Sequence, residues 1–194
     1  VSIVFLMTAC NSESSNEKEE SSEGQYKVGM TQLVEHPSLN AASEGFKKAF
    51  EDAGVSVAFV EQNAQNDHSL NATIANNFVS DQVDLIFANS TPSAQAVANE
   101  TTEIPIVFTS VTDAEAAQLV ESHEAPGRNV TGTLDNHPEA IEKAVTYVVN
   151  ELDAKKIGMI FNSGEQNSRA QVDEAKKQAE ALGAEVVEAS VSAS

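Results

Sequence analysis

The feature that most constrains this chain is a regular alternation of short apolar runs with longer amphipathic segments, which begins at residue 26. The runs typical of strands lie at 26–33, 55–62, 84–89, 105–110, 156–161 and 184–191. Amphipathic segments typical of helices lie at 38–54, 67–80, from 92 onward, 138–152 and 167–182. Strands and helices that alternate in this way predict an α/β fold, in which parallel strands are joined by right-handed crossovers.

Local residues refine the boundaries of these elements. Ser38 is a candidate N-cap for the first helix, and Gly54 is its expected stop. The second helix is expected to begin near Asp67, and Pro92 fits the first turn of the third. The segment 129–135 predicts an extended crossover out of the first group of elements.

An internal repeat indicates two related lobes. The residues Lys-Val-Gly-Met at 27–30 recur as Lys-Ile-Gly-Met at 156–159, an offset of 129 (156 − 27). The same offset relates Gly54 to Gly183, so it holds through strand, helix and stop. The alternative is that two unrelated strand–helix–strand units share residues that are common in such units, glycine stops included. The constant offset instead favours an N-terminal lobe at 26–135 and the start of a truncated second lobe at 136–194.

The first ten residues, VSIVFLMTAC, place an apolar run directly before the chain's single cysteine. The run is shorter than the roughly 20 residues needed to span a bilayer, and it fits the end of a secretion signal. Small residues before Cys10 resemble a bacterial lipobox, in which that cysteine is lipidated, although Met7 replaces the usual leucine. The alternative is a buried first strand with an incidental cysteine.

The segment after Cys10 is acidic and almost free of apolar side chains. Residues 11–24 carry five Glu and one Lys, a net charge of −4 (−5 + 1) out of −19 for the chain. Such a segment cannot bury enough apolar surface to fold, so 11–25 is interpreted as a disordered tether between a membrane anchor and the folded body. The overall charge disfavours nucleic-acid binding, which needs a Lys/Arg surface.

Six segments in order carry a resemblance to a known family. They are VGMTQLVEHPSLNAASEGFKKAFEDAG, NAQND, DLIFANSTPSAQAV, IPIVFTSVTDAEAAQLV, GRNVTGT and KIGMIFNSGEQNS. Together, over residues 26–194, they resemble the ABC-transporter substrate-binding lipoproteins whose better-known members bind tryptophan or tyrosine. One departure is Ser163, where the family pattern is expected to have proline.

The resemblance implies a type I periplasmic-binding fold, with two Rossmann-like lobes, parallel sheets and a ligand in the cleft between them. It also implies a monomeric, non-enzymatic protein without a cofactor, which delivers an amino-acid-like ligand to an ABC permease and its ATPase. The lipobox at Cys10 then implies a place outside the cell, lipid-anchored to the outer face of the cytoplasmic membrane.

Ligands of open parallel sheets bind beyond the carboxyl ends of the strands, which directs attention to the turns at those ends. Ser90 and Thr91 precede a helix whose free N–H groups suit an α-carboxylate. Thr109 and Ser110 end another strand and form a second candidate. The alternative for both pairs is that they only cap helices. Ser90 and Thr91 would then cap the helix from 92 onward, and Thr109 and Ser110 would cap a helix that begins at Asp113.

Further candidates follow the first strand of each lobe. Thr31, Gln32, Glu35 and His36 come after the first strand, where Gln32 and Glu35 could accept an ammonium group and His36 could stack or donate. The equivalent turn of the second lobe, and the crossover before it, supply the rest: Asn162, Glu165, Asn167, Ser168 and Asp135. A solvated loop is the ordinary alternative for these polar residues.

Enzymatic and metal-binding motifs are not found. The four histidines lack metal-type spacing, and no HExxH, P-loop, GxGxxG or GxSxG sequence occurs. Two alternatives to a transport receptor stay open: a sensor of the same fold for a membrane signalling partner, and a secreted α/β enzyme.

Overall fold

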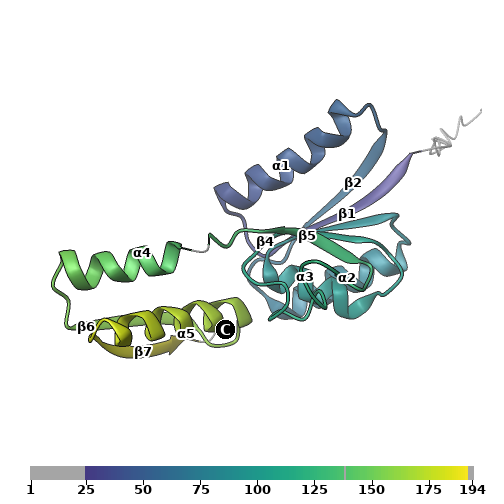
Figure 1. Ribbon diagram of the computed structural model, residues 1–194. Helices are drawn as coiled ribbons and strands as arrows, with labels where there is room; N and C mark the ends of the chain where they lie inside the picture. Colours follow the sequence, from purple (N-terminus) through teal and green to yellow (C-terminus); the bar gives the residue numbers. More distant parts are fainter. Residues whose placement is uncertain (1–24, 138, 192–194) are drawn as a thin grey trace, which may run out of the picture.

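A computed structural model describes residues 25–137 and 139–191 (Figure 1). The lipobox at Cys10 and the tether prediction, except for Gln25, lie outside the described residues. The elements form two groups, one around a five-stranded sheet and one around a two-stranded sheet, joined by the segment after residue 134 (Figure 1).

The first sheet has the strand order β2-β1-β3-β4-β5, and every neighbouring pair is parallel. Its strands are β1 (Tyr26–Gln32), β2 (Val57–Asn63), β3 (Leu85–Asn89), β4 (Ile106–Val111) and β5 (Val130–Leu134). Its helices are α1 (Pro37–Asp52), α2 (His68–Ser80) and α3 (Thr91–Glu100). The predicted α/β alternation of strands and helices is confirmed.

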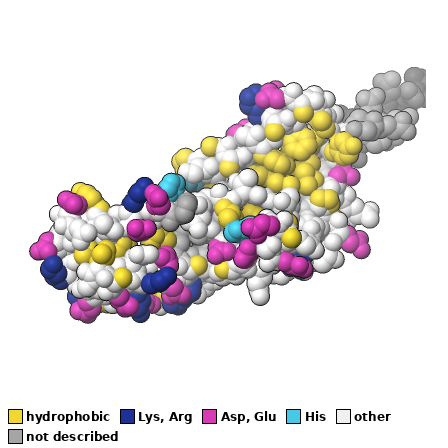
Figure 2. All heavy atoms as spheres, viewed as in Figure 1, with side chains coloured by type: hydrophobic (Ala, Val, Ile, Leu, Met, Phe, Trp, Pro, Cys, Tyr) yellow, Lys and Arg dark blue, Asp and Glu magenta, His cyan; other side chains and the backbone are white. Residues whose placement is uncertain are grey.

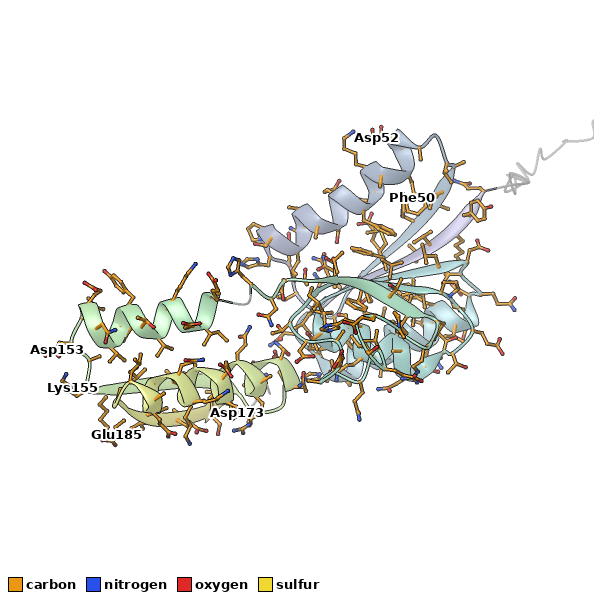
Figure 3. All side chains as sticks on the ribbon, viewed as in Figure 1. Phe50, Asp52, Asp153, Lys155, Asp173 and Glu185 are labelled. Atoms are coloured by element: carbon orange, nitrogen blue, oxygen red, sulfur yellow. The ribbon has the colours of Figure 1, made fainter. Side chains whose placement is uncertain are left out.

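Helices cover the two faces of this sheet unequally. The larger core lies under α2 and α3, where Phe78 fills the space that a side chain at Gly29 would need. On the other face, α1 places Phe46 flat against Phe87, with ring centroids 4.0 Å apart. Phe50 meets β2 further along α1 (Figure 3). Val28, Met30 and Phe87 form the smaller, second core on this face. Hydrophobic side chains also gather on the surface beside α1 (Figure 2).

Three local expectations were wrong. The segment expected as a crossover is strand β5, because Val130 enters the main core beside Ile106. The N-cap of α1 is His36 rather than Ser38, because Pro37 takes the first helical position and His36 Nδ1 accepts the Ser38 N–H at 3.2 Å. Residues 114–118 form turns, so no helix begins at Asp113.

The expected cap at Asp67 is confirmed. Its carboxylate accepts the Ser69 hydroxyl and N–H, both at 2.7 Å, and the Leu70 N–H at 3.3 Å. The hydrogen bond from the Ser69 side chain, followed by those from the two backbone N–H groups, lowers the pKa of Asp67 below its ordinary value. The first turn of α2 is therefore fixed by a charged cap.

The second group contains α4 (Ala140–Thr146), a π-helical turn (Tyr147–Glu151), β6 (Lys156–Asn162), α5 (Gln166–Ala181) and β7 (Glu185–Val191). Helix α5 begins and ends 129 residues after α1 (166 − 37 and 181 − 52), as the repeat predicts. Gly54 and Gly183 both adopt positive φ after these helices, 66° and 82°. Among the described strands β1 has two neighbours, whereas β6 has only β7.

Candidate functional site

The candidate site lies at the carboxyl edge of the first sheet. In its strand order, the chain direction across the sheet reverses between β1 and β3, and this switch point is where doubly wound sheets bind ligands. The turn after β1 leads to α1 on one face, and the turn after β3 leads to α3 on the other. Two polar turns therefore diverge from adjacent strands (Figure 1).

The turn after β3 has a strained backbone at a predicted residue. Ser90 has φ 129° and ψ 159°, a conformation that normally requires glycine. Its Oγ accepts the Ser93 N–H at 3.4 Å, and its own N–H donates to the Thr109 carbonyl at 3.1 Å. Thr91 follows, only 2 % exposed. The start of α3 is thereby held against the end of β4.

Beneath this turn lie buried polar groups without a partner among the described residues. Ser93 Oγ donates to Asn71 Oδ1 at 3.1 Å, while Asn71 Nδ2 has no partner. Thr31 Oγ1 is likewise buried and unpaired. Unpaired buried polar groups are costly and rare, and they concentrate where a ligand, ion or water completes the site. Asn71 was missed because an asparagine inside a helix gives no signal in the sequence.

The end of β4 carries a bulge that places the second predicted pair. The register between β4 and β5 shifts between Phe108 and Val111, so Thr109 and Ser110 together oppose one residue, Thr133. Ser110 adopts φ 55°, and the hydroxyls of Thr109 and Thr133 lie 3.1 Å apart. Bulges of this kind re-aim side chains beside functional sites.

Gly132 makes this bulge possible, and the site prediction did not include it. A Cβ at this position would overlap the Phe108 carbonyl oxygen and lie 2.6 Å from the Phe108 ring. A glycine inside a strand signals a close backbone approach, which is the signal that could have found it.

The end of β1 borders a polar cavity of about 300 Å³. Gln32 and Glu35 line it, with Asn40, Asn63 and other side chains of α1 and β2. Gln32 is largely committed to α1, since its Nε2 donates to Asn40 Oδ1 at 2.8 Å. His36 is occupied as the α1 cap, so Glu35 is the most available of these predicted groups.

Acidic groups at the β1–β2 side of the site are partly compensated by one lysine. Lys47 Nζ lies 2.6 Å from Glu44 and 3.1 Å from Glu61, both of which line the cavity. The hydrogen bond to Glu44 raises the pKa of Lys47 against a smaller opposing effect of burial, and Glu61 adds to the rise. Lys47 therefore stays charged and is held to these carboxylates.

The residues predicted from the second lobe lie in the β6–α5 turn, the counterpart of the β1–α1 turn. Asn162 Nδ2 donates to Glu165 Oε1 at 2.7 Å, so these two residues build the turn. Asn167 Oδ1 is buried without a partner among the described residues, and Ser168 lines an apolar groove. Asp135 is exposed after β5, and its N–H donates to the Val111 carbonyl at 3.0 Å.

Within 25–137 and 139–191, no three His, Cys, Asp or Glu side chains come together as metal ligands. In the same ranges, no helix combines the length and the apolar character needed to cross a membrane.

These features define the class of the protein. A doubly wound parallel sheet with polar turns at its carboxyl edge, followed by a second βαβ unit of the same design, is the type I periplasmic-binding fold. It has two Rossmann-like lobes, of which the second is incomplete here. More particularly, residues 27–194 match the ABC transporter substrate binding protein family, and the chain belongs to this family.

A curated relative supports the same assignment. A tyrosine-binding protein of Clostridioides difficile (strain R20291) is 47 % identical over 201 residues. The match covers 98 % of this chain and 58 % of the relative. The chain therefore spans somewhat more than half the length of this relative.

Solved structures agree on the fold. A domain from Streptococcus pneumonia in complex with L-Trp has a TM-score of 0.80 at 33 % identity, covering 86 % of this chain and 57 % of its own. The ligand-free, open structure of a substrate-binding protein from Clostridium difficile has a TM-score of 0.62 at 44 % identity, covering 87 % and 58 %. The L-Trp complex is thus the better superposition although its sequence is less similar.

Proposed function

We propose that this protein is an extracytoplasmic solute-binding lipoprotein that captures an aromatic amino acid between its lobes and delivers it to an ABC permease and its ATPase. The observation that carries this proposal is the convergence of the ends of β1, β3 and β4 at one sheet edge, with strained Ser90 and the Ser110 bulge among them. Strain and bulges at a topological switch point are features of a binding site.

The chemistry of this edge suits an amino acid. The N-terminus of α3 provides the Thr91 N–H and a partial positive charge for the α-carboxylate, with Ser90 and Thr109 as neighbouring hydroxyl groups. Glu35, which lines the cavity at the end of β1, is a partner for the ammonium group. The aromatic side chain is inferred from the relatives that bind tyrosine and L-Trp.

The second lobe is proposed to close over the ligand through the β6–α5 turn. Asn167 supports this role, because its buried Oδ1 lacks a partner among the described residues. The better superposition on the L-Trp complex than on the open relative fits a family in which the lobes move. A ligand that prefers the closed arrangement would shift the population toward it.

A thermal-shift experiment tests the ligand class. The full-length protein is heated with each of the twenty amino acids in turn, and L-tyrosine or L-tryptophan is expected to raise its melting temperature. At a ligand concentration 100 times Kd, binding stabilises the folded state by about 2.7 kcal/mol, which is a shift of several degrees. The proposal fails if none of the twenty changes the melting temperature.

The membrane anchor is tested separately. Cys10→Ser in the full-length protein, expressed with its secretion signal in a bacterial host, removes the proposed lipid site. We expect the wild type to partition into a detergent phase and the Cys10→Ser variant into the aqueous phase, because an acyl chain contributes about 0.8 kcal/mol per buried CH₂. Equal partitioning of both proteins would contradict the anchor.

A further inference from the structure

A fully buried amide ends strand β3 directly before the strained turn. Asn89 has 0 % exposure, and its Nδ2 donates to the Leu39 carbonyl at 2.7 Å and to Ser43 Oγ at 3.0 Å. Both partners belong to α1, so this side chain joins the end of β3 to the first two turns of α1. The contact spans 50 residues of sequence.

The end of β1 is joined to the same place. Gln32 is the register neighbour of Asn89, and its Oε1 accepts the Ser43 hydroxyl at 3.2 Å. Its Nε2 donates to Asn40 Oδ1 at 2.8 Å and to the Val34 carbonyl at 3.2 Å. We call the four residues Gln32, Asn40, Ser43 and Asn89 the amide clasp.

Asn89 is a poor residue for packing alone. Its Oδ1 is buried and has no hydrogen-bond partner among the described residues, which costs the desolvation of that oxygen. A leucine, which has the same number of side-chain heavy atoms, would leave no unsatisfied polar atom beside α1. What asparagine supplies, and leucine cannot, is a pair of donors aimed at α1.

The clasp fixes both turns that flank the switch point. It holds the turn at 33–36 through Val34 and α1, and it holds the residue before Ser90 on the other side. A backbone in the glycine region persists only where its surroundings determine it from several sides. Ser90 is held by the Thr109 carbonyl and by Ser93, and Asn89 adds the link to α1.

We infer that Asn89 is a positioning residue for ligand binding, which acts through the amide clasp by holding the β1–α1 and β3–α3 turns at a fixed separation. Both of its donor bonds go to α1, so the role is argued from those bonds and not from a contact with the ligand. The inference rests on the proposed function, since it takes the edge formed by these turns as the ligand site. It predicts that Asn89 matters more for affinity than for stability.

The chain offers a matched control at the opposite edge of the sheet. Asn129 precedes β5, and its Nδ2 also donates to backbone carbonyls, those of Ile104 at 2.6 Å and Thr101 at 3.3 Å. It braces backbone by the same kind of hydrogen bond, but at the amino end of the strands. Asn129→Leu therefore reports what losing such a brace does away from the site.

The experiment compares L-tyrosine and L-tryptophan binding by isothermal titration calorimetry to full-length wild type, Asn89→Leu and Asn129→Leu. We expect Asn89→Leu to weaken binding about tenfold or more, with a melting temperature no lower than that of Asn129→Leu. Asn129→Leu should lower the melting temperature and leave the affinity within about twofold. Ser43→Ala, which removes only the central link of the clasp, should weaken binding by an intermediate factor.

Each other outcome has a distinct meaning. Wild-type affinity in Asn89→Leu overturns the inference, as does an equal loss of affinity in Asn129→Leu. If Asn89→Leu does not fold, Ser43→Ala decides, and an unchanged affinity there overturns the inference. If wild type binds neither amino acid, the proposed ligand class itself fails, and the inference fails with it.

Discussion

Gly132→Ala is expected to destabilise the protein by about 3 kcal/mol or more, the largest effect of any single methyl group that we identify. The added Cβ would overlap the Phe108 carbonyl oxygen and meet the Phe108 ring at 2.6 Å. A backbone carbonyl in a paired strand cannot rotate aside, so β4 and β5 must separate at the bulge. Chemical denaturation of the full-length variant, followed by circular dichroism, measures the loss.

Gly45→Ala is the control for this prediction. Gly45 lies within α1, and a Cβ there would have no atom within 4 Å. This variant should be at least as stable as wild type, because alanine is favoured over glycine inside a helix by about 0.5–1 kcal/mol. The structure of the bulge would be wrong if the two alanine variants unfolded at the same denaturant concentration.

The second large effect concerns the strain at Ser90. Ser90→Gly and Ser90→Ala both remove the hydroxyl that caps α3, and glycine is also the better of the two residues at an N-cap, which adds to the difference between the variants. Only glycine adopts φ 129° and ψ 159° without strain. We therefore expect the glycine variant to be more stable than the alanine variant by about 1–3 kcal/mol, measured by thermal unfolding of the two proteins side by side.

Ser38 provides the control with the opposite sign. It lies in the first turn of α1, where the backbone is helical and alanine is favoured over glycine by up to about 1 kcal/mol. The order of stability should therefore reverse between positions 90 and 38. Alanine more stable than glycine at both positions would mean that Ser90 is not strained.

Much of the fold could be predicted from the sequence because the elements are locally self-consistent. The apolar run at 84–89, the Asp67 cap and the stop at Gly54 each have one ready physical interpretation, and each is present. The constant offset of the repeat predicted that α5 begins and ends 129 residues after α1. Expectations were wrong where tertiary packing decided, as for β5, whose Val130 is a core residue in an otherwise exposed strand.

The candidate site was predictable only in outline. The rule that ligands bind at the carboxyl ends of parallel strands located Ser90 and Thr109. It could not locate Asn89, Asn71 or Thr133, because their neighbours belong to segments that are distant in the chain. Gly132 is recognisable in the sequence as a glycine inside a strand-like segment. Only the structure shows that Phe108 is the residue that lies against it.

The ligand is proposed to bind at the carboxyl edge formed by β1, β3 and β4. A crystal structure of the full-length protein with L-tyrosine tests it most directly. We expect the ligand carboxylate within hydrogen-bonding distance of the Thr91 N–H at the start of α3, beside Ser90 and Thr109. Ligand density elsewhere, for example in the separate cavity of about 310 Å³ bordered by Phe108, Val120 and Leu134, would contradict the claim.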